Sequence, residues 1–354
     1  MKKIRLVILS AFLSPYRSGA EAMVEEVSVR LPEEFDVTIV TGRYSRKLPT
    51  RSTLGGRVQV IRVGLGLPID KWLYPLLAPM QLGKLHPDII HAVLETFAGL
   101  ALFFCRCRAK KILTLQTTNR TFLKKMIVHY PDRVTAISEE LARIAASLGR
   151  KDVVVIPNGI DLTGIREATE FHAKDSGRVL FVGRLEPMKG VDTLLHAFAK
   201  AIKGLDPSVH LRIVGSGSEE KNLKKLAADL EIDHRVTFTG RVSGKALFDE
   251  YAKAEIFCGL SRSEALGNVF LESQAAGCAL LATNTGGIPE IVKDGETGLL
   301  VPADDPEAAA AELRHLLTDP SLRARLSNAA RKLAENYGWD GVARRYSEEL
   351  TKLK

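Results

Sequence analysis

The sequence predicts an α/β protein made of two doubly wound domains. Short apolar runs rich in β-branched residues alternate with helical patterns along the whole chain, which is typical of βαβ units. Most of these runs are apolar without alternation, as expected for parallel strands that helices cover on both faces. A length of 354 residues is too great for one ordinary core and suits two domains.

Thirteen runs are predicted to form strands, and the helices between them indicate right-handed crossovers. In the first half the predicted strands are 4–9, 37–41, 58–63, 88–92, 111–115, 133–137 and 152–156. In the second half they are 178–183, 210–215, 235–240, 255–259, 278–282 and 298–301.

The domain boundary is expected in the polar connection 156–177, which contains a Pro-Asn-Gly turn signal. The predicted domains are therefore 1–165 and 166–337. The last segment, 338–354, has an amphipathic pattern with its apolar residues on one face of a helix. Those residues are Trp339, Val342, Tyr346 and Leu350.

The N-terminus and the cysteine content favour a cytoplasmic protein. The first residues imitate a signal peptide, but Arg5 interrupts the apolar run and a buried first strand explains it better. No apolar stretch approaches the ~18 residues of a membrane span. Four cysteines are too few for a disulfide framework in a chain of this length, which indicates reduced thiols.

The positive charge is concentrated in the first half. Residues 1–165 hold 24 Lys and Arg against 14 Asp and Glu, whereas residues 166–354 hold 26 against 28. A basic half favours an anionic partner such as a phospholipid surface or an acidic acceptor, and a solvated basic surface without a partner is an equal alternative. Nucleic acid is disfavoured because no aromatic-studded basic motif accompanies the charge. The segment 120–130 mixes lysines with large apolar side chains, as interfacial helices and ordinary amphipathic helices both do.

Two glutamates frame a helix start in the stretch SRSEALGNVFLES (261–273). Glu264 is expected in a loop and Glu272 in the second turn of the helix that follows Gly267 and Asn268. The amides from Gly267 to Phe270 would form an open helix N-terminus, which is a natural anion site. Carboxylates beside an anion make sense if the ligand carries both phosphates and hydroxyls, as a nucleotide sugar does. The alternative is two surface glutamates with no joint role.

A second stretch, FVGRLEPMKG (181–190), supplies cations at the end of a strand. Gly183 allows the backbone to turn, Arg184 can fork onto phosphate oxygens, and Lys189 adds a point charge. Two cations match a diphosphate leaving group without a metal, and the absence of a D-x-D motif argues against a metal-clamped transferase. Simple solvation of the loop is the alternative.

Three further glycine turns are candidates for ligand contact. Gly215 belongs to a G-x-G turn whose third fingerprint position is Glu220, which argues against an NAD enzyme. The turn that contains Arg241 and Val242 could present its backbone to a nucleobase. Gly19 stands at the first strand–helix turn, where glycine permits close approach. A tight turn explains the G-x-G equally well and is also the alternative for the stretch with Arg241 and Val242, whereas a simple helix start is the alternative for Gly19.

Nine stretches in register resemble the retaining GT-B glycosyltransferases of family 4. They are SGAEAMVEEV, AISEELA, VVVIPNGIDL, FVGRLEPMKG, IVGSGSEEKNL, VTFTGRV, EALGNVFLESQAAG, ATNTGGIPEIV and DGETGLLV. They cover nearly the whole second half and are spread over the first half.

The resemblance implies two Rossmann-like domains that face each other across a cleft, with the donor bound mostly by the second and the last helix crossing back to the first. It implies that Arg184 and Lys189 neutralise the leaving diphosphate. Glu264 would face the transferred sugar and Glu272 would hold the ribose hydroxyls.

The remaining donor contacts are also carried over from the resemblance. The amides of Gly267, Asn268 and Val269 would meet sugar and phosphate, and Gly19 would lie under the phosphates. Gly183 and Gly215 complete the expected donor site, and Arg241 and Val242 fall where the base is held. The implied reaction retains the anomeric configuration, uses no metal and no cofactor, and lets the leaving phosphate help deprotonate the acceptor.

One position departs from the family pattern. Many relatives carry a histidine after the strand that corresponds to 111–115, where this sequence has Gln116. Glutamine cannot take a proton at neutral pH, so it is expected only to orient an acceptor or sugar hydroxyl. His91 is interpreted as a structural residue at a strand end.

The leading hypothesis is a cytoplasmic glycosyltransferase of glycan or glycolipid biosynthesis. It would use a nucleotide-sugar donor and a glycan or lipid-linked acceptor, with peripheral contact at the inner face of the membrane. A nucleotide-sugar epimerase or hydrolase of the same fold and a non-catalytic partner protein are the alternatives. The complete arginine, lysine and glutamate set favours transfer.

Overall fold

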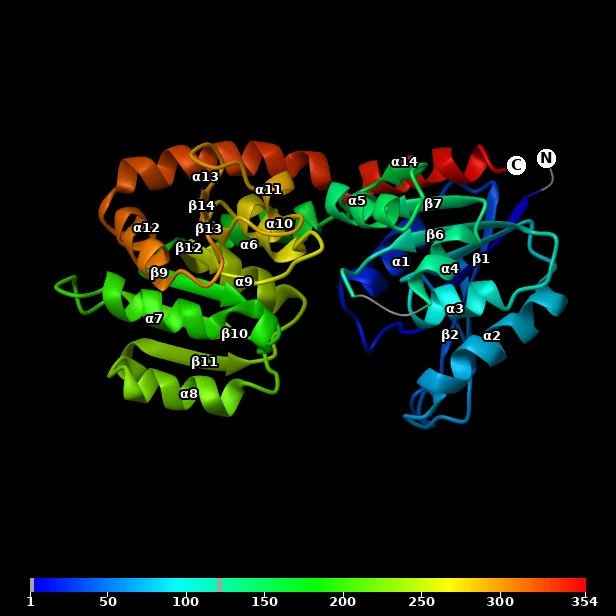
Figure 1. The fold of residues 1–354 in the computed structure, drawn as a ribbon, viewed down its shortest axis with the longest axis horizontal. Coiled ribbons are helices and arrows are strands. Elements are labelled where there is room, and N and C mark those ends of the chain that lie inside the picture. The colour runs from blue at the N-terminus through cyan, green and yellow to red at the C-terminus, as the bar shows by residue number, and fades with distance from the viewer. Residues whose placement is uncertain (1–2, 120–122) are drawn as a thin grey trace. The chain divides into compact units, whose positions relative to one another are not determined.

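The computed structural model describes residues 3–119 and 123–354, and the chain divides into two compact units. One unit is Met1–Gly159 together with Trp339–Lys354, and the other is Ile160–Gly338. Both are α/β units, and each is described by itself (Figure 1).

The first unit is built on a sheet with the strand order β3-β4-β2-β1-β5-β6-β7-β8 in the described residues. Neighbouring strands are parallel except for β3 and β4, which pair antiparallel at one edge. The strands are β1 Ile4–Ser10, β2 Phe35–Gly42, β3 Arg51–Leu54, β4 Val58–Val63, β5 Ile89–Val93, β6 Lys110–Leu115, β7 Arg133–Ala136 and β8 Val153–Val155.

Helices cover this sheet and include the last helix of the chain. They are α1 Gly19–Arg30, α2 Asp70–Leu85, α3 Phe97–Phe103, α4 Lys124–His129, α5 Glu139–Ser147 and α14 Trp339–Thr351. The four apolar residues of the α14 pattern, Trp339, Val342, Tyr346 and Leu350, are all buried in the core of the first unit. The amphipathic pattern of the sequence therefore correctly predicted the buried face.

The second unit is built on a parallel sheet with the order β11-β10-β9-β12-β13-β14. The strands are β9 Asp175–Val182, β10 His210–Val214, β11 Val236–Gly240, β12 Ala254–Gly259, β13 Ala279–Thr283 and β14 Leu299–Val301. The helices are α6 Leu162–Phe171, α7 Val191–Ala201, α8 Glu220–Asp229, α9 Lys245–Lys253, α10 Asn268–Ala275, α11 Ile288–Ile291, α12 Pro306–Thr318 and α13 Pro320–Ala334. Three short 3₁₀ turns are η1 Pro187–Lys189, η2 Asp233–Arg235 and η3 Glu335–Tyr337.

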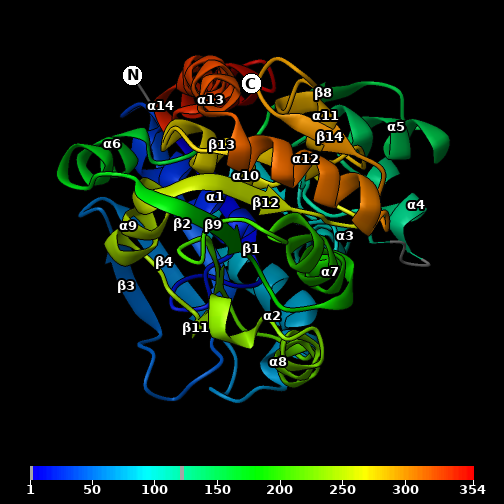
Figure 2. The same ribbon diagram turned by 90° about the vertical axis from the view of Figure 1, so that its left-hand side faces the viewer.

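Helices lie on both faces of the second sheet. Helix α7 packs against α8 and α12, while α6 packs against α9 and α10 (Figure 2). Double coverage explains why the strands are apolar without alternation, because both of their faces are buried.

All thirteen predicted strands are present, with ends within three residues of the predicted ones. The prediction missed β3, which has the sequence RSTL and pairs only with β4. This edge strand alternates exposed and partly buried residues and contains no apolar run, so it gives no core signal.

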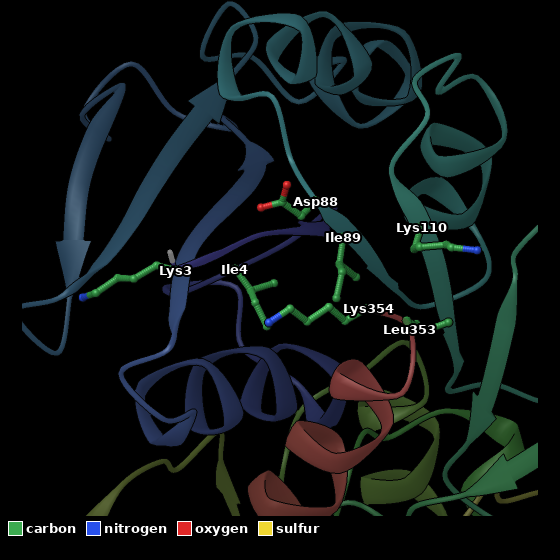
Figure 3. A pocket seen from close by; sticks show the side chains of 7 residues that line it. All are labelled: Lys3, Ile4, Asp88, Ile89, Lys110, Leu353 and Lys354. Carbon is green, nitrogen blue, oxygen red and sulfur yellow. The ribbon is translucent and has the colours of Figure 1, made fainter. Parts of the chain in front are cut away.

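A cavity of about 420 Å³ in the first unit lies at the amino-terminal edge of the sheet (Figure 3). Ile4, Ile89 and Lys110 line it from the starts of three strands, and Leu353 and Lys354 border it from the chain end. Ligands of open α/β sheets bind at the opposite, carboxyl ends of the strands. The cavity is therefore not the candidate functional site.

Candidate functional site

The predicted site residues of the second unit come together at one edge of its sheet. Arg184 and Lys189 follow β9, Gly215 follows β10, Arg241 follows β11, and the loop with Glu264 follows β12. Because these strands are parallel, all four loops lie at the carboxyl edge, where ligands of such sheets bind.

Gly183, Gly215 and Gly240 hold three strand ends against one another. The Gly183 amide donates to the Val214 carbonyl at 3.0 Å, and the Gly215 amide donates to the Gly240 carbonyl at 2.9 Å. Gly215 has a φ of 146°, and a Cβ there would lie 1.8 Å from the Gly183 carbonyl oxygen. These glycines therefore have a packing role that accounts for their presence without a ligand.

Arg184 is an exposed cation at this edge. Within the described residues its guanidinium forms no ion pair, although its charge helps to lower the pKa of the Glu186 carboxyl, and one of its N–H groups donates to the Met188 sulfur at 4.0 Å. The remaining N–H donors of the exposed guanidinium are available for an anion.

Lys189 and Glu264 form one half-buried ion pair. The Lys189 ammonium donates to the Glu264 carboxylate, and both side chains are 15% exposed. Lys189 ends the 3₁₀ turn η1 and is followed by Gly190, where a Cβ would lie 2.0 Å from the Leu260 carbonyl oxygen. The turn is thus packed against the end of β12, so that the cation of one loop reaches the carboxylate of another.

Arg262 ties the same two loops together and was not identified from the sequence. Its amide donates to the Met188 carbonyl at 2.8 Å, and its guanidinium contacts Asp192 at 2.7 Å and Asp304 at 2.6 Å. Burial is the largest single effect on Asp192 and opposes its ionisation, but the hydrogen bond and charge of Arg262 together with backbone hydrogen bonds outweigh burial, so the pKa of that carboxyl is lowered. Sequence reasoning considered Arg184 and Lys189 as cations and had no signal that Arg262 faces inward.

The N-terminus of α10 lies between the two predicted glutamates. Gly267 precedes the helix with a φ of 92°, a conformation that favours glycine, and its carbonyl accepts from the Phe270 amide at 2.9 Å. In the described structure no side chain caps this helix start. The amides of Asn268 and Val269 are thus at an uncapped helix start, as the sequence predicted.

Glu272 lies in the second turn of α10, as predicted, and is anchored by a buried tyrosine. The Tyr251 hydroxyl donates to one Glu272 carboxylate oxygen at 2.7 Å. Tyr251 is fully buried, and burial together with the nearby carboxylate raises the pKa of its hydroxyl far above the usual value. No sequence pattern points to Tyr251, because its contact with Glu272 depends on tertiary packing of α9 against α10.

Gly286 and Gly287 support the backbone of the Glu264 loop. The Gly287 amide donates to the Glu264 carbonyl at 3.0 Å. A Cβ on Gly286 would lie 2.0 Å from that same carbonyl oxygen, and one on Gly287 would lie 2.2 Å from the Ala265 carbonyl oxygen. In the sequence this Gly-Gly pair stands out only as part of a stretch that resembles the family, and its supporting role is visible only in the structure.

Gly19 and Gln116 belong to the first unit, apart from the other predicted site residues. Gly19 is the first residue of α1, and the amide of the preceding Ser18 donates to Glu21 at 2.8 Å. The Gln116 side chain is 7% exposed and exchanges hydrogen bonds with the Asn158 amide at 3.0 and 3.2 Å. Asn158 thus occupies one N–H group and the carbonyl oxygen of the Gln116 side chain, which was expected to orient a hydroxyl.

A buried ion pair of Glu95 and Lys124 shapes the loop that contains Gln116. Glu95 accepts from the Lys124 ammonium at 2.9 Å, the Gln116 amide at 2.9 Å and the Thr117 hydroxyl at 2.8 Å. Of the two alternatives for the segment 120–130, Lys124 does not fit an interfacial helix, because its side chain is 4% exposed and Glu95 neutralises it. Residues 120–122 of that predicted segment lie outside the described residues.

His91 is a structural residue, as predicted. It is 1% exposed, and its Nε2 lies 2.7 Å from the Thr114 hydroxyl. Burial lowers the pKa of this imidazole to about 3.

The described residues contain neither a metal-ligand cluster nor a membrane-spanning helix. No group of three or more His, Cys, Asp or Glu side chains in residues 3–119 and 123–354 is arranged to hold a metal ion. Over the same residues, no helix is both long and apolar enough to cross a bilayer.

Two family models match the chain in succession. The model described as Glycosyltransferase Family 4 matches residues 17–163, and the model described as Glycosyl transferases group 1 matches residues 165–333. Together the two models cover most of the chain and place it with a family of glycosyltransferases.

Relatives of similar sequence are also named glycosyltransferases. The chain is 33% identical to a D-inositol 3-phosphate glycosyltransferase of Thermomonospora curvata, over 99% of this chain and 96% of that protein. It is 34% identical to one of Streptomyces bingchenggensis over 65% of this chain, and the match spans about half (55%) of that relative's length.

Solved structures show the same fold at low identity. A sucrose-phosphate synthase of Thermosynechococcus elongatus matches with a TM-score of 0.86 at 20% identity, over 99% of both chains. Anabaena HepE, solved in complex with UDP and glucose, matches with a TM-score of 0.78 at 19% identity, over 99% of this chain and 100% of that chain. The chain belongs to the family 4 glycosyltransferases and has the GT-B fold.

Proposed function

We propose that this protein transfers a sugar from a nucleoside-diphosphate sugar to an acceptor hydroxyl, with retention of configuration and without a metal. The observation that carries the proposal is the convergence of two cations and two carboxylates at one sheet edge around an uncapped helix start. A nucleotide sugar presents both the phosphates and the hydroxyls that such a set recognises.

The cationic part of the site would bind the diphosphate. Arg184 is exposed and has its donors available, and Lys189 has two N–H donors beyond the one that Glu264 accepts. The amides at the start of α10 add partial positive charge. Together they would stabilise the negative charge that develops on the leaving diphosphate.

The two glutamates would bind hydroxyls. Tyr251 anchors one oxygen of Glu272 and so holds the carboxylate in one orientation, in which it would accept from the ribose hydroxyls. Glu264, which accepts from Lys189, would face the transferred sugar. Gly183, Gly215, Arg241 and Val242 would border the phosphates and the base, and Gly19 of the first unit would approach the phosphates.

The proposed step breaks the bond between the anomeric carbon and the diphosphate oxygen and forms a bond from the same carbon to the acceptor oxygen. The acceptor proton moves to the leaving phosphate, which becomes the product diphosphate. Gln116 has no role as a base in this scheme, because an amide does not take a proton at neutral pH.

Structural neighbours suggest which donor to test first. HepE was solved with UDP and glucose, and an Escherichia coli protein titled trehalose-6-phosphate was solved with UDP-2-fluoro glucose. The relatives named D-inositol 3-phosphate glycosyltransferase make a phosphorylated polyol one acceptor candidate. A glycan or lipid-linked hydroxyl at the cytoplasmic face of a membrane is the other.

Calorimetry with UDP, GDP, ADP, CDP and TDP tests the donor site. One nucleotide is expected to bind, and Arg184→Ala and Glu272→Ala should each weaken it about tenfold or more, because each removes a charge-assisted contact. Lys203→Ala is the matched control, since Lys203 is exposed in the same unit beyond the end of α7. No binding by any nucleotide, or equal binding by the three variants, would refute the assignment.

An assay for turnover separates transfer from the alternative chemistry. With the nucleotide sugar alone, a transferase should release little diphosphate, and release should rise when an acceptor is added. Full-rate turnover without an acceptor would favour the epimerase or hydrolase.

A further inference from the structure

The first unit carries a concentrated patch of exposed apolar side chains, here called the apolar tip. It consists of six residues in the loop before α2 and on α2 itself, namely Leu65, Leu67, Ile69, Trp72, Leu76 and Met80. Their exposed fractions run from 38% for Leu67 to 68% for Met80. Among the described residues twelve large hydrophobic side chains are exposed, half of them in this tip, whereas the second unit contributes only Phe171. A patch of neighbouring exposed apolar side chains indicates an interaction surface, whereas single exposed apolar residues are common on any protein.

The loop part of the tip is held in place by a buried carboxylate. Asp70 is fully buried and accepts from the amides of Leu65, Gly66 and Leu67 at 2.9, 2.7 and 3.0 Å. A Cβ on Gly66 would lie 2.7 Å from the Arg46 amide nitrogen, so the loop is also packed against the preceding loop. A fixed loop thus exposes Leu65 at 61%, instead of burying it.

The helix part of the tip follows from the period of α2, which lies beside α3 in Figure 1. Trp72, Leu76 and Met80 recur every four residues and share one face of the helix. Tyr74 and Ala78 on the opposite face are fully buried, and the Tyr74 hydroxyl donates to the Val40 carbonyl at 2.9 Å. Helix α2 is thus apolar on its outer face as well as on its core face. A surface helix that contacts only water normally has a polar outer face.

The charge around the tip has one sign. Residues 43–84 contain eight lysines and arginines, and the single acidic residue among them is the buried Asp70. Lys71 and Lys84 are exposed at the two ends of α2, and Arg46 and Lys47 are exposed in the loop that packs against Gly66. The Lys71 ammonium lies 5.5 Å from the centre of the Trp72 ring. The tip is therefore an apolar surface with a cationic border.

We infer that the apolar tip docks onto an anionic lipid bilayer. Apolar side chains enter the acyl boundary and surrounding lysines and arginines meet the lipid phosphates, which is how interfacial helices bind. A second copy of the chain fits less well, because a two-fold interface would place the two cationic borders against each other. Nucleic acid fits less well because leucine, isoleucine and methionine do not stack on bases as aromatic side chains do.

The tip also points to the class of acceptor, an extension that rests on the proposed transferase function. The Trp72 ring lies 5.3 Å from the Phe97 ring, and Phe97 lies 6.4 Å from Phe12, which follows β1. The apolar surface thus continues to the carboxyl edge of the first sheet, where ligands of such sheets bind. A hydroxylated headgroup of a membrane lipid is the acceptor that this continuity favours.

Vesicle flotation tests the docking surface directly. The full chain is expected to bind phosphatidylcholine vesicles that contain phosphatidylglycerol, and to bind pure phosphatidylcholine and high-salt samples much less. Trp72→Gln, Leu76→Gln and Met80→Gln should each lower the partition coefficient roughly tenfold, since each removes an apolar side chain from the acyl boundary. Phe171→Gln is the matched control, because Phe171 is 81% exposed in the second unit, and it should bind as the unaltered protein does.

A second readout does not depend on any substitution. The chain has two tryptophans, of which Trp339 is 5% exposed and Trp72 is 64% exposed. Anionic vesicles should shift tryptophan emission to shorter wavelength, and spin-labelled acyl chains should quench it. Absence of the shift and of flotation, unchanged binding by the α2 variants, or a stable dimer in sedimentation equilibrium would each overturn the inference. Nucleotide binding by the α2 variants is expected to be unchanged, so failure of docking and failure of the donor site are distinguishable.

Discussion

At the scale of single residues, the proposed function has Lys189 and Glu264, which form an ion pair, present opposite charges to the diphosphate of the donor. A carboxylate next to a diphosphate opposes binding of the diphosphate, whereas the ammonium favours it. Because the two side chains are paired and only 15% exposed, the effect of each on a nucleotide is strong and opposite in sign.

The first prediction separates binding from transfer at this pair. Glu264→Gln should bind UDP several-fold more tightly than the unaltered protein, because it removes a negative charge beside the phosphates, while transfer falls at least a hundredfold. Lys189→Gln should lose both binding and transfer. Calorimetry and steady-state kinetics on the same preparations measure the two effects, and weaker UDP binding by Glu264→Gln would contradict the assigned geometry.

The second prediction concerns the anchor of Glu272. Tyr251→Phe removes the hydroxyl that donates at 2.7 Å to the carboxylate, so Glu272 loses its fixed orientation. UDP affinity should fall roughly five- to tenfold, which corresponds to one net hydrogen bond. A structural effect alone would weaken UDP and 2′-deoxy-UDP equally. If Glu272 holds the ribose, the preference for UDP over 2′-deoxy-UDP should narrow in Tyr251→Phe, and an unchanged preference would refute that role.

At the scale of elements, the site depends on loops that glycines allow to touch. The carbonyl of Glu264 is held by the Gly287 amide and leaves no room for a side chain at Gly286. The position of the Glu264 carboxylate is thus set by the loop after β13 as well as by its own loop.

The third prediction tests this support. Gly286→Ala should lower the free energy of unfolding by about 1–3 kcal/mol and reduce transfer, because its Cβ would displace the Glu264 backbone. Gly295→Ala is the control, since Gly295 also has a positive φ but a Cβ there meets nothing within 4 Å. Urea unfolding and UDP binding of both variants provide the comparison. Equal loss of binding in the two variants would show that backbone strain alone explains the effect.

Features that leave a local pattern in the sequence were predictable, whereas features that depend on contacts between distant residues were not. Thirteen strands were predicted correctly because a strand that is buried on both faces has an unbroken apolar run. The edge strand β3 is polar and has no such run, so it was not predicted. Arg184, Lys189, Glu264 and Glu272 stood out because charged residues beside strand-end glycines are unusual. Contacts such as those of Tyr251 and Arg262 join residues distant in sequence, and no local pattern reports them.

The same limit explains why the sequence could not distinguish the two alternatives for the segment that contains Lys124. Its neighbours in sequence are lysine and large apolar residues, which is the pattern of an interfacial helix. Its charge partner, Glu95, lies 29 positions earlier and was not considered. The exposed apolar surface lies instead on α2. Because both the outer and the core face of this helix are apolar, its apolar residues do not recur with a clear helical period, and the sequence gives no sign that one face is exposed.

At the scale of the whole molecule, the first unit contains a buried histidine that makes its stability depend on pH. Burial lowers the pKa of His91 in the folded state to about 3, whereas the ordinary value is 6.5. The unfolded chain therefore binds the proton first as pH falls. This contribution to stability is fully present above about pH 6.5 and is lost progressively below it, by up to about 1.4 kcal/mol per pH unit.

The fourth prediction follows from this loss of stability at low pH. The unfolding free energy of the first unit should decrease from about pH 6.5 to about pH 4.5, and His91→Gln should show a slope smaller by up to about 1.4 kcal/mol per unit. His234→Gln, at an exposed position of the second unit, should keep the slope of the unaltered protein. Urea titrations across this range measure the slopes. Identical slopes for the unaltered protein and His91→Gln would contradict the prediction.

The membership of α14 in the first unit has a consequence for synthesis of the chain. Five of its side chains complete a core whose strands leave the ribosome nearly 200 residues earlier, since β8 ends at Val155 and α14 begins at Trp339. The second unit, Ile160–Gly338, is contiguous and has all its residues before α14 is made. A nascent chain can therefore finish the second unit while the groove for α14 on the first is still uncovered. The order of folding would then reverse the order of translation, and chaperones that bind apolar surface would find their target in the half that was made first.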